Sequence, residues 1–205
     1  YREIDGTWYY FNKGYSPVGA LYYTGVTPIM GTSVLGGDKN TAVKKMVTMY
    51  MNSKKSYPSD ALGKGGADNI TEFCEILYDE AVYEGVKPEV VFAQAMHETG
   101  WLQFGGDVKI EQFNFAGIGA VGGGAAGASF ENVTIGLRAQ VQHLKAYASI
   151  ESLNRPGTPV DPRFNQVTRG TAPYVEWLGI NENPYGKGWA GALRYGINLV
   201  KSFII

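Results

Sequence analysis

The stretch PEVVFAQAMHETGW, residues 88–101, predicts a helix that begins at its proline and ends at its glycine. Proline suits the first helical turn, where its missing N–H has no helical partner, and glycine is common just beyond a helix end. At 100° per residue, Glu98 falls in line with Val91 and Ala95, at the edge of an apolar arc. His97 points to the opposite side. The pattern therefore predicts a carboxylate that faces inward in the last turn of a helix.

Two effects should raise the pKa of Glu98 above its ordinary value. The negative end of the helix dipole disfavours another anion, and burial against apolar neighbours disfavours the charged form. A carboxyl group that stays protonated near neutral pH is what a glycosidase needs to protonate a leaving oxygen. The alternative is that Glu98 lies at a helix boundary and reaches solvent.

Outside this stretch the apolar periodicity predicts a mainly helical domain. Asn69, with Glu72 three residues later, has the capping-box pattern that opens a helix, and Gly85 ends it. Residues 154–173 contain four prolines and are expected to form a long connection. Further helices are predicted from residue 39 onward, from residue 132 or 134 to residue 148, around residues 174–178 and around residues 189–203.

The first 27 residues are expected to form an aromatic arm, separate from a catalytic domain at residues 28–205. The runs WYYF at residues 8–11 and LYY at residues 21–23 favour short strands in a hairpin or an extended arm. Such an arm either packs on the main domain or acts as a binding element. Residues 28–38 are predicted to be a linker or loop.

Composition excludes several classes of protein. The 205 residues carry 18 Lys plus Arg against 19 Asp plus Glu, so a nucleic-acid binder or a polybasic membrane anchor has no electrostatic basis. No stretch approaches 18 apolar residues, so membrane insertion is not expected. The chain opens with Tyr1-Arg2-Glu3 and without a signal segment, so we expect a soluble fragment or processed product. One cysteine permits no intramolecular disulfide, and Cys74 lies in an apolar helical stripe, where an inert, buried thiol is expected.

Two motifs suggest chemistry that their surroundings do not support. GIGAVG at residues 117–122 fits the dinucleotide pattern G-x-G-x-x-G, but no strand pattern precedes it and no helix opens at its last glycine. The glycines at residues 117–127 instead predict a flexible or tightly turning loop that orders on ligand binding. His97-Glu98 resembles the start of the zinc motif H-E-x-x-H, yet position 101 is Trp. No metal and no cofactor are therefore expected.

Together, FAQAMHETGW at residues 92–101 and NFAGIG at residues 114–119 resemble the glucosaminidase family of bacterial peptidoglycan hydrolases, glycoside hydrolase family 73. The resemblance covers about residues 39–203. It implies a lysozyme-like, mainly helical fold with a groove between two lobes, here with a glycine-rich loop as a minimal β-lobe. It also implies hydrolysis of the glycan strand of peptidoglycan at N-acetylglucosamine, with Glu98 as the catalytic acid.

The chain departs from the family pattern at the second carboxylate. Many members carry a T-x-E element after the cleft segment, where this chain has GGGAAGAS at residues 122–129. The next acid, Glu131, is the candidate, and Asp107 and Glu111 are others; for each, a solvated surface role is the alternative. Either the 2-acetamido group of the substrate acts as nucleophile, or Glu131 acts as base in an inverting reaction. The sequence leaves both mechanisms open.

The resemblance also places residues along the sugar path. Asn114, Phe115 and Gly117 are expected to line it, through amide hydrogen bonds, an aromatic face and close backbone approach. Trp189 and Tyr195 match a later aromatic pattern of the family and are expected to add a second aromatic wall. For each aromatic side chain, core packing is the alternative.

These observations predict a secreted, cell-wall-associated, monomeric endo-β-N-acetylglucosaminidase that acts on peptidoglycan glycan strands, as an autolysin does. A lysozyme-like muramidase or a lytic transglycosylase would share the fold and the single acid. A non-catalytic cell-wall-binding module is the other alternative. The sugar at the new reducing end of the product distinguishes the enzymes, and binding without solubilisation of cell walls would identify the module.

Overall fold

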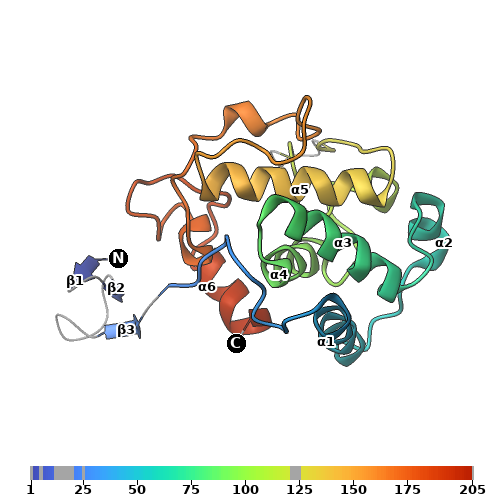
Figure 1. Cartoon of the computed structure of the whole chain (residues 1–205), viewed down its shortest axis with the longest axis horizontal. Helices are drawn as coiled ribbons and strands as arrows, with labels where there is room; N and C mark the ends of the chain where they lie inside the picture. Colours follow the sequence, from blue (N-terminus) through green and yellow to red (C-terminus); the bar gives the residue numbers. More distant parts are fainter. Residues whose placement is uncertain (1, 5–6, 12–20, 25, 121–125, 205) are drawn as a thin grey trace.

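The chain folds into a mainly helical body preceded by a small sheet (Figure 1), which confirms the predicted fold class. The computed structural model describes the backbone of residues 2–4, 7–11 and 21–24, and residues 26–120 and 126–204 in full. The strands are β1 (Arg2–Ile4), β2 (Thr7–Phe11) and β3 (Leu21–Thr24). The α-helices are α1 (Lys39–Asn52), α2 (Ser59–Leu62), α3 (Ile70–Glu84), α4 (Pro88–Thr99), α5 (Val133–Ala148) and α6 (Tyr195–Leu199). Short 3₁₀ turns are η1 (Gly63–Gly65), η2 (Ile110–Gln112), η3 (Phe164–Gln166) and η4 (Val175–Leu178), and η5 (Val200–Ile204) is a π-helical turn.

The two N-terminal aromatic runs form strands, as predicted. β2 pairs antiparallel with β1 and with β3, and Tyr10 lies opposite Tyr23. The expected boundary at residue 27 stays a prediction, but the segment that follows is fixed to the helical body. Ile29 is fully buried, its N–H donates to the Pro173 carbonyl and its carbonyl accepts from Lys87 N–H. Residues 28–38 therefore form a loop, as predicted, whose first part belongs to the core.

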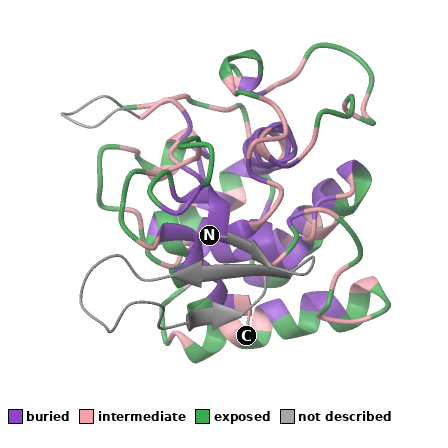
Figure 2. Cartoon of the chain, turned by 90° about the vertical axis from the view of Figure 1, so that its left-hand side faces the viewer, coloured by how far each residue is buried: buried purple, intermediate pink, exposed green. Residues whose placement is uncertain are grey.

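Helix α4 is the centre of the helical body. Every residue of α4 is buried except His97 and Glu98, because α1, α3, α5, α6 and η5 pack around it. A helix that is buried on all sides needs such a shell of neighbours. Figure 2 shows the resulting pattern, with buried residues (purple) gathered where the helices meet and exposed residues (green) on the outside. The last turn of α4 is the part of this helix that reaches the surface.

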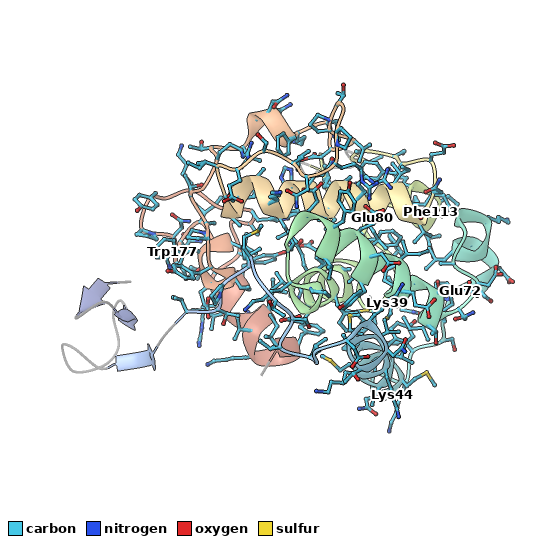
Figure 3. The ribbon with its side chains drawn as sticks, viewed as in Figure 1. Lys39, Lys44, Glu72, Glu80, Phe113 and Trp177 are labelled. Carbon is cyan, nitrogen blue, oxygen red and sulfur yellow. The ribbon has the colours of Figure 1, made fainter. Side chains whose placement is uncertain are left out.

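Local signals set the helix ends largely as predicted. Asn69 caps α3 by accepting from Glu72 N–H, and Gly85 ends α3 with φ of 74°. Glu72, at the start of α3 in Figure 3, departs from the capping-box pattern. Its carboxylate accepts from the backbone N–H of Asp68 and from the side-chain amide of Asn69, so it fixes the loop one residue earlier than expected. Asn132 opens α5 in the same way as Asn69 opens α3.

A buried ion pair holds the long connection against the helices. Lys145 on α5 donates to Glu84 on α3 at 2.9 Å, and both side chains are 1% exposed. The Glu84 carboxylate also accepts from the backbone N–H groups of Asn154 and Arg155. Burial alone would raise the pKa of Glu84, but these hydrogen bonds outweigh it and hold the pKa below its ordinary value. The connection predicted at residues 154–173 is thus anchored at its start, and the short turn η3 lies within it.

The C-terminal helices differ from the sequence prediction. The helix expected from residue 189 begins at Tyr195, and Trp189 lies in the preceding loop. Next to Tyr195, Gly196 lets α6 approach η4: a Cβ at this position would lie 1.9 Å from the Val175 carbonyl oxygen. Of the predicted glycine-rich loop, residues 121–125 lie outside the described residues. Among the described residues between α4 and α5 there is no strand, only turns and η2.

We predict that Gly196→Ala lowers the free energy of unfolding by about 1–3 kcal/mol, because the new methyl group must push α6 away from η4. Alanine otherwise stabilises a helix relative to glycine, so a loss would have no origin in helix propensity. Gly191→Ala, at an exposed position with open space around it, is the matched control and should change stability little. Denaturant unfolding measures both, and a Gly196→Ala variant as stable as the wild type would contradict the packing argument.

Candidate active site

Glu98 opens onto a surface pocket at the end of α4. The helix stops at Gly100, which has φ of 58°, and Trp101 and Leu102 keep positive φ values of 62° and 60°. The chain therefore turns sharply and places the next loop beside the acid. The pocket has a volume of about 190 Å³. Its lining residues are Glu98, Thr99, Phe104, Gly106, Asp107, Val108, Asn114, Gly117 and Ala120.

The predicted orientation of Glu98 needs correction. His97 is exposed, as expected, but Glu98, which was expected to face inward, is exposed as well. The reason is that α4 reaches the surface in its last turn on the side that carries His97 and Glu98, while Thr99 in the same turn stays buried. His97 nevertheless packs edge-on against Tyr195, with ring centroids 5.5 Å apart, and burial lowers its pKa.

A chain of buried hydrogen bonds leads to Glu98. Gln140 Nε2 donates to the Val91 carbonyl and to Gln94 Oε1, at 3.1 and 3.0 Å. Gln94 Nε2 in turn donates to the Tyr195 hydroxyl oxygen at 3.1 Å, and the Tyr195 hydroxyl donates to Glu98 Oε1. Gln94 and Gln140 are fully buried, and Tyr195 is 4% exposed.

The direction of every bond in this chain is fixed by its first acceptor. The Val91 carbonyl only accepts, so it requires the Gln140 amide nitrogen, which presents a donor to Gln94. Gln94 therefore offers its oxygen to Gln140 and its nitrogen to Tyr195. Because the Tyr195 oxygen already accepts, its hydrogen is directed to Glu98.

This arrangement assigns different roles to the two oxygens of Glu98. Oε1 accepts from Tyr195, so a proton on the carboxyl group is carried by Oε2. Oε2 lies on the side of Gly117, where a Cβ on that residue would be 3.9 Å away. Gly117 has φ of +64°, a conformation that glycine adopts without strain. The predicted close approach of backbone at Gly117 is thus toward the acid itself.

The pKa of Glu98 is raised, as predicted, by burial. The accessible part of the side chain faces the pocket, and the surrounding protein still withdraws water from the carboxylate. The hydrogen bond from Tyr195 lowers the pKa and partly offsets burial. A carboxyl group with a raised pKa, an oriented free oxygen and access to a pocket has the properties of a general acid.

Asn114 lines the Glu98 pocket, but its amide hydrogen bonds go to the protein backbone, and Phe115 lies in the core. Both N–H groups of the Asn114 amide are used, since Nδ2 donates to the carbonyls of Ile118 and Ala128. Its oxygen accepts from Ile118 N–H, so this 1% exposed side chain shapes the loop and has no donor left for a sugar. Phe115 is fully buried against Phe73, with ring centroids 5.1 Å apart. It is a core residue, which is the alternative that the sequence left open.

Trp189 and Tyr195 do not form one wall. Tyr195 is buried and acts as the hydrogen-bond partner of the acid. Trp189 lines a neighbouring pocket, where it packs edge-on against His143. The aromatic residue that lines the Glu98 pocket is Phe104, which the sequence analysis missed. Its position after the helix end, in a segment that resembles no regular element, provided no periodic signal.

The candidate second carboxylates occupy different places. Asp107 lines the pocket of Glu98 and is the only other acid among its described lining residues. Glu111 in η2 and Glu131, just before the cap of α5, are exposed and line none of the described pockets that contain Glu98. The undescribed residues 121–125, VGGGA, contain no carboxylate. The role predicted for Glu131 is untested by this geometry and stays a prediction.

Metal binding and membrane insertion can also be judged on the described residues. In the described ranges, no group of three or more His, Cys, Asp or Glu side chains is placed to hold a metal ion. Within the same residues no helix has the length and apolar content required to cross a membrane. Cys74 is buried, and burial raises the pKa of its thiol, as expected for an inert cysteine.

Comparison with known proteins finds a similar bacterial protein. A protein of Borreliella burgdorferi (strain ATCC 35210 / DSM 4680 / CIP 102532 / B31), described as an uncharacterized protein, is 47% identical over 106 residues. The matched part is 52% of this chain and 51% of that protein, so the chain spans about half the length of this relative. No solved structure matches the chain.

The family model named Glucosaminidase, described as mannosyl-glycoprotein endo-beta-N-acetylglucosaminidase, matches residues 74–201. This range is more than half of the chain and includes Glu98, its pocket and the helix that carries Tyr195. The chain therefore belongs to the glucosaminidase family, and this membership supports glycoside hydrolase activity and a peptidoglycan-hydrolase function.

Proposed function

We propose that this protein is an endo-β-N-acetylglucosaminidase that cleaves the glycan strand of peptidoglycan, with Glu98 as general acid. The observation that carries the proposal is the state of Glu98: a carboxyl group with a raised pKa, held through Oε1 by Tyr195 and open to a pocket through Oε2. Family membership favours this substrate class. We further propose that the protein acts outside the cytoplasm at the cell wall, where that substrate is found.

The geometry supports a defined proton transfer. Glu98 donates the proton on Oε2 to the glycosidic oxygen as the bond to the anomeric carbon breaks. The carboxyl group becomes an anion, and the hydrogen bond from Tyr195 to Oε1 becomes charge-assisted and stronger. An interaction that strengthens as charge develops stabilises the transition state more than the ground state.

We propose Asp107 as the second carboxylate, because it lines the same pocket as Glu98. In an inverting reaction it would activate the water that attacks the anomeric carbon. If the 2-acetamido group of the substrate attacks instead, Asp107 would orient that group. Both roles need a carboxylate within the pocket, which is the property that favours Asp107 over Glu131.

Glu98→Gln should lower kcat roughly 10²- to 10⁴-fold, because the amide has the same shape but no acidic proton. The measurement is release of muropeptides from purified peptidoglycan, with mass spectrometry of the new reducing ends. N-acetylglucosamine at those ends agrees with the proposal, whereas N-acetylmuramic acid or a 1,6-anhydro sugar would identify a muramidase or a transglycosylase. Glu75→Gln, on the exposed face of α3, is the matched control. Retention of more than about a tenth of the activity by Glu98→Gln would exclude Glu98 as the acid.

The same variant should be more stable than the wild type at neutral pH. Because the pKa of Glu98 is raised in the folded state, the stability that this group contributes is present below its ordinary pKa of 4.5 and is lost as the pH rises through the raised value. Glutamine does not titrate, so the difference in Tm between Glu98→Gln and the wild type should increase from pH 4 to pH 8. A difference that stays constant over this range would show that burial does not act on Glu98 as described.

Tyr195→Phe should move the alkaline limb of the kcat/KM profile to higher pH. The hydrogen bond from Tyr195 lowers the pKa of Glu98, so its removal raises that pKa and keeps the acid protonated at higher pH. At the same time kcat should fall about tenfold, since the developing carboxylate loses a donor. Tyr185→Phe, at an exposed tyrosine, is the control. A limb that moves to lower pH in Tyr195→Phe would contradict the assigned direction of the hydrogen bond.

Asp107→Asn and Glu131→Gln separate the two candidates for the second acid. We expect Asp107→Asn to lose roughly 100-fold or more in kcat and Glu131→Gln to remain near wild type. Proton NMR of the first product then identifies the role of Asp107: an α anomer indicates a base, and a β anomer indicates attack by the acetamido group. The opposite ranking of the two variants would support Glu131, as the sequence predicted.

A further inference from the structure

A second pocket adjoins the one that contains Glu98, and Gly117 and Ala120 line both. Its volume is about 160 Å³, which is below the ~300–1,000 Å³ typical of sites for drug-sized ligands and fits one sugar-sized group. The side chains that define it come from α5, from the long connection and from the loop before α6. The lining residues are Gly117, Ile118, Gly119, Ala120, His143, Tyr147, Arg163 and Trp189.

His143 lines this pocket and is held in place by a carboxylate. Its Nδ1 lies 2.6 Å from Asp161 Oδ2, and because an ionised carboxylate only accepts, Nδ1 carries a hydrogen. The other oxygen of Asp161 accepts from the backbone N–H of Arg163 at 2.8 Å. Each oxygen of Asp161 therefore has a hydrogen-bond partner, and the bond to Nδ1 fixes the orientation of the His143 ring beside the pocket.

Arg163 supplies a positive charge at the same place. It is half-buried and close enough to Tyr147 to affect that hydroxyl electrostatically. No ion pair joins its guanidinium to any carboxylate in the part of the chain that the structure describes. Two other arginines do form ion pairs. Arg138 and Arg155 both bind Glu80, which lies between α3 and α5 in Figure 3.

Aromatic rings form the remaining wall. Trp189 packs edge-on against His143, with centroids 4.6 Å apart, and tilts toward Tyr147 at 5.9 Å. The Tyr147 hydroxyl donates to the Gly188 carbonyl, which fixes the ring. Fixed aromatic faces beside hydrogen-bonding groups suit a sugar, and an arginine beside them suits a carboxylate.

We infer that this pocket is a second sugar subsite that selects a carboxylate-bearing sugar, with Arg163 binding the carboxylate. The inference rests on the proposed function, since it concerns the unit next to the cleaved linkage. In peptidoglycan the neighbour of N-acetylglucosamine carries a lactyl substituent, so the carboxylate is either the lactyl group itself or a carboxylate of the attached peptide. Chitin has the same backbone linkage and no such group. Arg163 therefore favours peptidoglycan strands over uncharged strands of N-acetylglucosamine.

The test compares kcat/KM on three substrates. Chitooligosaccharides have no carboxylate, denuded glycan strands have the lactyl carboxylate, and strands with stem peptides have peptide carboxylates. We expect the wild type to prefer one or both carboxylated substrates, and Arg163→Gln to reduce that preference roughly 10- to 100-fold, the range for hydrogen bonds to charged groups. Arg163→Lys keeps the charge and should retain part of the preference. Lys44→Gln, which removes an exposed charge from α1 (Figure 3), is the control.

Each result has one interpretation. Loss of preference for denuded strands identifies the lactyl carboxylate as the recognised group, and loss confined to peptide-bearing strands identifies the peptide. An unchanged preference in Arg163→Gln, equal losses in the Gln and Lys variants, or a wild type that cleaves all three substrates equally well overturns the inference and leaves the proposed function intact. A wild type that cleaves none of the three contradicts the proposed function itself.

Discussion

The enclosure of α4 is the constraint on which the active site depends. A helix that is buried from Pro88 to Met96 has no free side and little freedom to shift, because close-packed interiors resist displacement. Its last turn reaches the surface at one place, and this place becomes the floor of the pocket. The sharp turn after Gly100 then returns the chain past Phe104 and Asp107, so the acid and its surroundings are fixed by one packed element.

The buried hydrogen-bond chain fixes which oxygen of Glu98 accepts a hydrogen bond from Tyr195. Three residues from three helices, Gln140, Gln94 and Tyr195, orient one another in sequence, so the hydroxyl at the end has one available direction. Among the residues that the structure describes, Gln140 Oε1 is buried and has no hydrogen-bond partner. Such unsatisfied groups are uncommon in proteins and destabilise the fold, which is the pattern expected where orientation of a functional group outweighs stability.

Local features of the fold could be predicted from sequence, and the site partners could not. Asn69 and Gly85 act through hydrogen bonds to their own helix, so their neighbours in sequence are sufficient to identify them. Tyr195 lies 97 residues from Glu98, and no periodic pattern links the two positions. The family resemblance implied that Tyr195 adds to an aromatic wall, whereas in the structure its hydroxyl donates to Glu98. Phe115 was expected to line the sugar path because it lies in the cleft motif of the family, but its ring packs into the core.

Gly117 and Ala120 form the wall that the acid pocket shares with the pocket of Arg163. Because this wall has no side chain larger than a methyl group, it would let neighbouring units of the proposed glycan substrate lie close to each other and to Glu98. Glu98 and Asp107 border one side, and Arg163 lies on the other, so the charges are separated along the path of the strand. A substrate carboxylate bound in the Glu98 pocket would lie beside the Asp107 carboxylate and would be repelled. In the proposed function, the same carboxylate in the next pocket would meet the Arg163 guanidinium, so electrostatics as well as shape would determine which sugar of an alternating strand occupies each position.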